Sequence, residues 1–306
     1  MRGRAMKVLN FGSVNIDITY RVPHFVRPGE TLSARSVTRN AGGKGFNQSV
    51  ALSRAGCEVY HAGHIGEDGA FLLELCRQYG VRTDYLTQVD VPTGNAVIQV
   101  DDDGANCILL YGGANQAMDE AFIREVLSRF DAGDLLVLQN EINCINRLIA
   151  LAHEAGLKIA INPAPMNDAI AKESLALADW IILNETEARD LIGVEEPFAQ
   201  LEALKESFPH SSFLLTLGVR GAICQTNGKI CTLGSCKVDA VDTTAAGDTF
   251  AGFFLAELVN GKTPQEALLT ATRASALAVT RHGAAQSVPA MKEVRSCALT
   301  PAPFQR

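Results

Sequence analysis

Short, continuously apolar segments alternate with segments of helical spacing along most of this 306-residue chain. The apolar segments cover residues 8–14, 59–65, 135–139, 158–162, 180–184 and 213–218. The segments with helical spacing, each ending at a glycine, cover residues 46–56, 71–80, 145–156 and 185–193. Strands that are apolar on both faces and separated by helices form parallel sheets that helices cover on both sides. The sequence therefore predicts an α/β fold with a doubly wound, mostly parallel sheet.

Two regions do not fit this alternation. Residues 94–112 contain two β-like runs on either side of an acidic turn ending in glycine. Residues 18–39 contain two extended runs separated by a segment with prolines and a glycine. Because neither region belongs in a doubly wound sheet, we expect them to form a small β-sheet lid over one edge. No repeat or low-complexity linker divides the chain, so residues 1–306 are interpreted as one domain.

The C-terminal part predicts a hairpin over 221–233 that turns at Asn227-Gly228, the pair that most strongly favours a two-residue hairpin loop. Helices are expected to follow over 248–260 and 264–281.

Composition excludes several function classes. The net charge of −7 contains no basic block, which argues against binding to nucleic acid or to an anionic membrane surface. No apolar run has transmembrane length, and no secretory signal precedes the first strand. The eight cysteines are scattered, with no spacing typical of a zinc site, so we expect free thiols in a reducing cytoplasm.

Residues 241–254, VDTTAAGDTFAGFF, carry the strongest chemical signal. Ala245, Ala246 and Gly247 have almost no side chain, so their backbone amides can approach an anion at a helix N-terminus. A carboxylate at Asp248 then suits a base that removes a proton from a hydroxyl during phosphoryl transfer. The alternative is that Asp248 only caps the helix. From this segment alone both interpretations stay open.

Other polar residues follow the apolar strands, where ligands bind in open α/β sheets. They are Asn15, Asp17, residues 42–47 (GGKGFN), Asn140-Glu141, residues 184–187 (NETE) and residues 218–221. Each has a purely structural alternative: a turn, a solvated loop or, for Asn184 with Glu187, a capping box. The glycine-rich segment is not a P-loop, and no dinucleotide-binding glycine pattern follows a strand, which argues against an NAD-dependent oxidoreductase.

The order and spacing of these motifs resemble the ribokinase family of sugar and nucleoside kinases over about residues 7–290. The two signature regions of that family are matched by NAGGKGFNQSVALSRAG (40–56) and DTTAAGDTFAGFF (242–254), and its middle motif by NETEA (184–188). The resemblance implies ATP-dependent phosphorylation of the primary hydroxyl of a furanose, with D-ribose giving ribose 5-phosphate as the first expectation. It further implies that Asp248 is the base and that Ala245, Ala246 and Gly247 form the anion hole.

The resemblance also implies the ligand contacts. The sugar would be held by Asn15, Asp17, Gly43, Lys44, Gly45, Asn47, Glu141 and Asp248. ATP would contact Asn184, Thr216, Leu217, Gly218, Val219, Arg220, Gly221, Gly247 and Thr272. Glu187 would hold Mg²⁺ through water, consistent with the reluctance of this ion to dehydrate. A K⁺ site is implied at Asp242, Thr244, Ala278, Arg281, Gly283 and Ser287, and a homodimer through the lid.

Departures from the family pattern leave the substrate open. The turn that opens the helix expected over 248–260 reads GDTFAG, with Ala251 where ribokinases commonly have asparagine. Tyr111 and Phe46 could contact a larger substrate or could belong to the core of the lid. The alternative is therefore a related kinase for another pentose, a ketose or a nucleoside. A binding protein without catalysis is disfavoured, because the AAGD turn and Glu187 are both intact.

Overall fold

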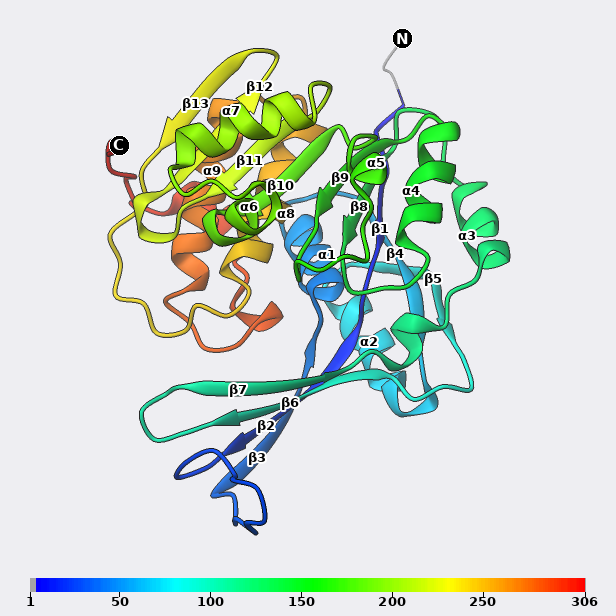
Figure 1. Ribbon diagram of the computed structural model, residues 1–306, viewed down its shortest axis with the longest axis vertical. Coiled ribbons are helices and arrows are strands. Elements are labelled where there is room, and N and C mark those ends of the chain that lie inside the picture. Colours follow the sequence, from blue (N-terminus) through cyan, green and yellow to red (C-terminus); the bar gives the residue numbers. More distant parts are fainter. Residues whose placement is uncertain (1–3, 306) are drawn as a thin grey trace.

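The main sheet has the predicted α/β architecture. The structure is a computed structural model that describes residues 4–305. Within that range a nine-stranded sheet has the order β13-β12-β11-β10-β9-β8-β1-β4-β5 (Figure 1). Its strands are β1 (Val8–Phe11), β4 (Val59–Ile65), β5 (Arg82–Gln88), β8 (Leu135–Gln139), β9 (Lys158–Asn162), β10 (Trp180–Asn184), β11 (Ser212–Thr216), β12 (Ala222–Thr226) and β13 (Lys229–Leu233).

The strands from β11 to β5 are parallel, and β12 and β13 add an antiparallel edge. The edge hairpin turns at Asn227 and Gly228, as predicted, and both residues have a positive φ, which two-residue hairpin loops require. β5 was not expected from the sequence. Its residues are mostly exposed because it lies at the sheet edge, so it lacks the apolar run of a central strand.

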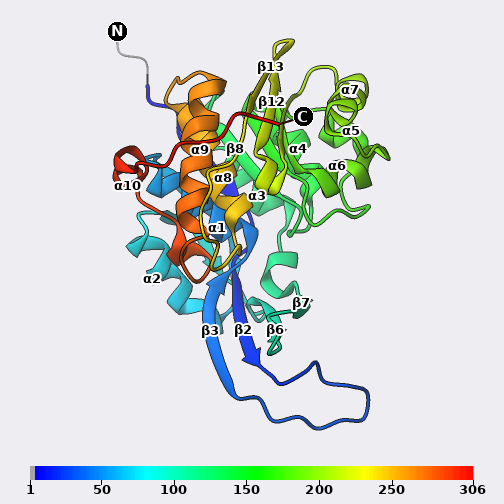
Figure 2. The same cartoon turned by 90° about the vertical axis from the view of Figure 1, so that its left-hand side faces the viewer.

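Helices cover both faces of the sheet (Figure 2). One face packs against α1 (Lys44–Arg54), α2 (Ala70–Gln78), α8 (Ala246–Val259), α9 (Pro264–Ala278) and α10 (Met291–Ser296). The other packs against α3 (Glu120–Leu127), α4 (Ile145–Glu154), α5 (Lys172–Leu175), α6 (Glu185–Ile192) and α7 (Pro197–Ser207). Successive strand residues point to opposite sides, so Val8 joins the first core and Leu9 the second. In the described part of the chain, no helix is both long and apolar enough to span a bilayer.

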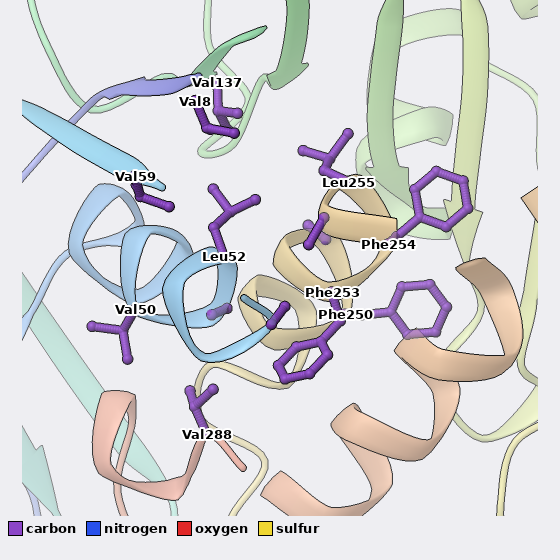
Figure 3. Packing of buried hydrophobic residues seen from close by; sticks show 14 of the residues in the cluster. Val8, Val50, Leu52, Val59, Val137, Phe250, Phe253, Phe254, Leu255 and Val288 are labelled. Carbon is purple, nitrogen blue, oxygen red and sulfur yellow. The ribbon is translucent and has the colours of Figure 1, made fainter. Parts of the chain in front are cut away.

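The contact between α1 and α8 positions the candidate site (Figure 3). Phe250 and Phe253 of α8 and Val50 and Leu52 of α1 belong to one buried cluster. A Cβ at Gly252 would lie 2.4 Å from the Cβ of Ala51, so only glycine permits this close helix approach. The first turns of α1 and α8, which contain Lys44 and Asp248, are thereby brought side by side.

A second sheet forms the lid. In the same described range it has four strands in the order β3-β2-β6-β7: β2 (Asn15–Arg21), β3 (Ser36–Gly42), β6 (Gly94–Val100) and β7 (Asn106–Tyr111). The first lid segment was placed at 18–39, but its strands extend from Asn15 to Gly42. The difference arises because β1 ends at Phe11 and only three residues separate it from β2, so Asn15 and Asp17 lie on a strand rather than in a turn. β1 runs directly into the lid, and the carboxyl ends of the parallel strands therefore face it (Figure 1).

Candidate active site

Asp248 does not cap helix α8. The N-cap is Ala245, in the left-handed conformation with φ 57°, and its side chain makes no capping bond. Asp248 stands in the first turn and is 7% exposed. Its Oδ2 accepts a hydrogen bond from Asn47 Nδ2 at 3.1 Å and its Oδ1 accepts one from Gln48 Nε2 at 3.0 Å. The capping interpretation of Asp248 is therefore wrong, because both oxygens are turned toward α1 instead of the backbone amides of α8.

The start of α8 presents free backbone donors. No protein acceptor is found within residues 4–305 for the amides of Ala245, Gly247 and Asp248. The amide of Ala246 is different, because it donates to the Thr243 carbonyl at 3.2 Å. A Cβ at Gly247 would meet no atom within 4 Å, so this side of the turn is open. Free amides at a helix N-terminus form an anion site, and here Asp248 follows it directly.

The glycines before α1 allow close approach. Gly43 has φ 91° and is the N-cap of α1. A Cβ at Gly42 would lie 2.0 Å from Asp17 Oδ2, and one at Gly45 would lie 2.4 Å from the Ser13 nitrogen. Larger residues at either position would displace the lid strand or the end of β1. These glycines therefore place the first turn of α1 against the carboxylate of Asp17.

Two acidic groups, Asp17 and Glu141, lie close enough to influence each other. Burial, together with the smaller effect of the negative charge of Glu141, raises the pKa of Asp17 to about 6. Glu141 Oε2 accepts hydrogen bonds from the Ser13 hydroxyl and from the Lys44 amide, the latter at 2.9 Å. Glu141 is thus fixed in place, while neither oxygen of Asp17 has a partner among the described residues.

Lys44 lies among three carboxylates. Burial lowers the pKa of its ammonium group, but the charges of Asp248, Glu141 and Glu187 raise it by more, so the net pKa is above the ordinary value. No carboxylate of the described residues forms an ion pair with Lys44. Its charge is therefore maintained and its donors are free for a ligand.

Two of the residues predicted to hold the sugar, Asn15 and Glu141, line a cavity of about 210 Å³ beneath the lid, whereas Asp17, Gly43, Lys44, Gly45, Asn47 and Asp248 are not part of its wall. Asn15, Leu110, Tyr111, Asn115 and Glu141 are among its walls. Asn115 accepts from the Val14 amide at 3.0 Å, so its amide nitrogen must donate to Asn15 Oδ1, at 2.7 Å. Asn15 therefore directs its own NH₂ group away from Asn115 as a free donor. Sequence reasoning missed this role of Asn115; the signal was a buried polar residue in the GGANQ motif.

The two aromatic residues that could contact a substrate, Phe46 and Tyr111, lie in different environments. Phe46 is fully buried and packs edge-on against Tyr79, with ring centroids 6.2 Å apart. It belongs to the core and does not reach the cavity. Tyr111 is 51% exposed and lines the cavity from β7, where it can meet a ligand when the lid closes.

A second cavity, of about 310 Å³, lies between α8, α9 and the loop after β11. The residues of the sequence prediction that line it are Thr216, Gly218, Val219, Gly221, Gly247 and Thr272. Thr272 is 5% exposed and its hydroxyl has no hydrogen-bond partner in the described structure, a costly arrangement that a bound polar group would relieve. Three predicted residues are elsewhere: Leu217 is buried in the sheet core, Arg220 is ion-paired with Glu185, and Asn184 caps helix α6. They lie beside this cavity, not in its wall.

Asn184 and Glu187 form the capping box that was the structural alternative for NETE. Asn184 Oδ1 accepts from the Glu187 amide at 2.8 Å, and Glu187 Oε2 accepts from the Asn184 amide at 2.9 Å. Glu187 Oε1 has no partner within residues 4–305, so one oxygen can still face the hydration shell of an ion. Capping and ion binding are thus compatible at this position.

Three of the residues predicted for K⁺, Asp242, Thr244 and Gly283, are joined by hydrogen bonds, whereas Ala278 is the last residue of α9 and the Ser287 hydroxyl donates to the Ala284 carbonyl. Asp242 accepts from the Thr244 amide and from the Gly283 amide, each at 2.9 Å. Burial raises the pKa of Asp242, but the hydrogen bonds from Thr244 and Gly283 lower it by more, so the carboxyl is ionised. Arg281 pairs with Glu293 at 2.7 Å, which leaves only its carbonyl for an ion. The described residues contain no cluster of three or more acidic, histidine or cysteine side chains suited to a metal.

A buried carboxylate that directly follows free helix amides, beside a cavity lined by Gly247, is the arrangement of a small-molecule kinase with a ribokinase-like fold. A family model described as pfkB family carbohydrate kinase matches residues 5–291. The chain belongs to this pfkB family of carbohydrate kinases.

Similar proteins cover nearly the whole chain. It is 36% identical to a ribokinase of Haemophilus influenzae, over 92% of this chain and 95% of that protein. It is 33% identical to a ribokinase of Schizosaccharomyces pombe, over 94% of this chain and 96% of that one. A solved structure of Arabidopsis thaliana ribokinase complexed with ribose and ATP is 31% identical, with a TM-score of 0.86, and covers 95% of this chain and 98% of that one.

Proposed function

We propose that this chain is an ATP-dependent kinase that phosphorylates the primary hydroxyl of D-ribose to give ribose 5-phosphate and ADP. The observation that carries the proposal is Asp248, buried directly after free helix amides and near both cavities. Gly247 lines the larger cavity, while Lys44, which interacts electrostatically with Asp248, bonds through its amide to Glu141 in the wall of the smaller one. Relatives named ribokinase and a ribokinase complex with ribose and ATP support this substrate pair.

In the proposed reaction, Asp248 takes the proton of the sugar hydroxyl as the hydroxyl oxygen forms a bond to the γ-phosphorus. The bond from that phosphorus to the β-phosphate oxygen breaks, and ADP leaves with the electron pair. The amides of Gly247 and Asp248 stabilise charge on the moving phosphoryl group. Mg²⁺, held through water near Glu187 Oε1, would neutralise phosphate charge. Lid closure would exclude water, which limits ATP hydrolysis.

Sugar recognition is proposed to use free donors and acceptors of Asn15, in the wall of the smaller cavity, and of Asp17 and Asn47, which lie outside that wall. Asn15 supplies an NH₂ group, Asp17 supplies two free carboxylate oxygens, and Asn47 Oδ1 is buried without a partner among the described residues. The backbone amide of Gly43, which has no acceptor among the described residues, completes the set. A ring with hydroxyls in several directions would satisfy these groups.

A coupled assay of ADP release tests the proposal directly. Ribose, deoxyribose, fructose, psicose and nucleosides are compared at equal concentration. We expect ribose to have the highest kcat/KM. A higher value for a nucleoside or a ketose would replace ribose with that substrate while retaining the kinase assignment, and no sugar-dependent ADP release at all would overturn the assignment.

A K⁺ site is proposed at the loops joined by Asp242. K⁺ would bind backbone carbonyls and the Ser287 hydroxyl beside the anion hole, and so order the amides of α8. Replacing K⁺ with Na⁺ at constant ionic strength should lower kcat at saturating ribose and ATP. Asp242→Asn should weaken the K⁺ dependence. Equal rates in the two salts would contradict this site.

A homodimer through the lid is proposed from the exposed edge strand β7. Ile108, Leu109 and Leu110 are 51%, 71% and 56% exposed, an apolar edge that favours pairing with another chain. Leu109→Asp should convert dimer to monomer in light scattering after size-exclusion chromatography. The control Ile230→Asp is on β13, an edge strand of the main sheet and not of the lid, and should leave the dimer intact. A wild-type protein that is monomeric at micromolar concentration would refute the proposal.

We also propose a cytoplasmic location. All eight cysteines are free, and burial raises the pKa of Cys57 and Cys224 to about 12, as expected for inert thiols in a reducing compartment.

A further inference from the structure

Amide side chains lie in the centre of the main sheet, where central strands are normally apolar. Asn10 is in the middle of β1 and Gln139 is at the end of the neighbouring strand β8, and both are completely buried. A buried amide without partners costs about 1–3 kcal/mol of stability, so hydrocarbon side chains would be the simpler choice here. Their presence requires an explanation beyond packing.

Both amides belong to a hydrogen-bonded network that ends on Asp248. Gln139 Nε2 donates to Asn10 Oδ1 at 3.0 Å and to Gln48 Oε1 at 2.7 Å. Gln48, on α1, then donates from Nε2 to Asp248 Oδ1 at 3.0 Å. We call Asn10, Gln139 and Gln48 the buried amide network. It joins two central strands and one helix to the carboxylate.

The direction of every bond in the network is determined at its far end. Asn10 Nδ2 donates to the Gly45 carbonyl at 2.7 Å, and a carbonyl can only accept. The oxygen of Asn10 must therefore face Gln139, which donates to it. Because that same nitrogen of Gln139 also contacts Gln48, it meets the oxygen of Gln48 and leaves the Gln48 nitrogen for Asp248.

The tautomer of His61 independently supports the same orientation of the Asn10 amide. Burial lowers its pKa to about 4, so it is neutral near pH 7. His61 Nε2 faces the Gly12 carbonyl at 3.2 Å and must carry the proton, so Nδ1 accepts from the Ser49 hydroxyl at 2.8 Å. The Ser49 oxygen is then free to accept from Asn10 Nδ2, at 2.8 Å. With this assignment each amide nitrogen of the network meets an acceptor, and the one oxygen of the network without a hydrogen-bond partner in the described structure is Gln139 Oε1.

The Gln139 side chain also needs a glycine at position 12 of the chain. A Cβ at Gly12 would lie 2.3 Å from Gln139 Oε1. Only glycine at this position leaves room for the Gln139 side chain between β1 and β8. The backbone of β1 and the amide network therefore depend on each other.

We infer that Gln48 and Gln139 are positioning residues for Asp248; the inference rests on the proposed role of Asp248 as the base. Gln139 holds the Gln48 oxygen, which forces the Gln48 N–H toward Asp248. Without Gln139, the Gln48 amide can turn and place its oxygen against the carboxylate. Asn47 holds the second oxygen of Asp248, so the carboxylate plane is fixed and the remaining lone pairs face the hydroxyl to be deprotonated.

A double-mutant cycle tests the inference. Gln48→Met and Gln139→Met are made singly and together, and kcat, both KM values and the Tm are measured. Each single variant should lower kcat about tenfold, with the KM values for ribose and ATP nearly unchanged, because Asp248 is misoriented while ligand contacts persist. The double variant should have the kcat of Gln48→Met alone, because Gln139 acts only through Gln48.

Gln225→Met is the matched control. Gln225 is also a buried glutamine of the main sheet, 5% exposed, and lies on β12 outside the network. It should retain wild-type kcat. If Gln139→Met does not fold, Gln139→Glu is used: an ionised carboxylate there would accept the Gln48 N–H and draw it away from Asp248, again with reduced kcat.

The outcomes separate the inference from the proposed function. An unchanged kcat in folded Gln139 variants, or losses that add in the double variant, would overturn the positioning role while Asp248→Asn remains inactive. Wild-type turnover in Asp248→Asn would instead overturn the base itself.

Discussion

Asp248→Asn should lower turnover by about 10²–10⁴-fold, the usual contribution of a positioned general base. The carboxylate now accepts N–H groups on both oxygens, from Asn47 and Gln48. An asparagine has only one acceptor, so one of these donors would face an NH₂ group. We expect this to reduce the Tm by about 2–4 °C, while ATP binding is retained because the free amides of α8 remain.

Turnover is measured by ADP release at saturating ribose and ATP, and ATP binding by calorimetry. Glu257→Gln is the control, because Glu257 is another buried acid of α8, 4% exposed, at the opposite end of the helix from Asp248. It should keep wild-type turnover. A purified, folded Asp248→Asn protein with near wild-type turnover would contradict the proposed mechanism.

Asp17→Asn should bind ribose more weakly but fold more stably at neutral pH. The folded-state pKa of Asp17 is about 6, above the ordinary 3.8. Between about pH 4 and pH 6 the folded protein keeps this proton while the unfolded chain releases it, so wild-type stability falls as the pH rises through this window. Asparagine has no such dependence. The increase in the free energy of unfolding of Asp17→Asn over the wild type should be absent near pH 4 and on the order of 2 kcal/mol by pH 7.

Loss of a charged acceptor should raise the KM for ribose about 10- to 100-fold in Asp17→Asn. The wild-type kcat/KM for ribose should also fall below about pH 6, where Asp17 is protonated and accepts fewer hydroxyls. Denaturant unfolding at several pH values and steady-state kinetics measure both effects. If the variant's stability followed the wild-type curve from pH 4 to pH 7, the elevated pKa would be refuted.

Much of the fold could be predicted from local pattern. The apolar segments at 135–139, 158–162 and 180–184 coincide with β8, β9 and β10, because central parallel strands are buried on both faces. The Asn227-Gly228 hairpin was correct because its turn chemistry is local. β5 and helices α3, α5, α7 and α10 were not predicted; β5 is a mostly exposed edge strand, so it lacks the apolar run of a central strand.

Within the site, sequence could indicate residue types but not their partners. It identified Asp248, Lys44, Glu141 and Glu187, which the structure brings together. It did not identify Gln48 or Gln139, although a polar residue at the end of a buried strand was visible. Their partners are 200 and 91 residues away, a separation that no local pattern encodes.

The sequence by itself determined the strand–helix alternation, the helix start at the AAGD turn and the glycines that permit close backbone approach, because these depend on neighbouring residues. Only the tertiary structure decided whether Asp248 caps its helix or faces α1, and which way each buried amide points. Those outcomes depend on the packing of α1 against α8 at Gly252 and on hydrogen bonds between distant strands. The direction of each amide is fixed by the partners that it meets in the folded core, such as the Gly45 carbonyl for Asn10.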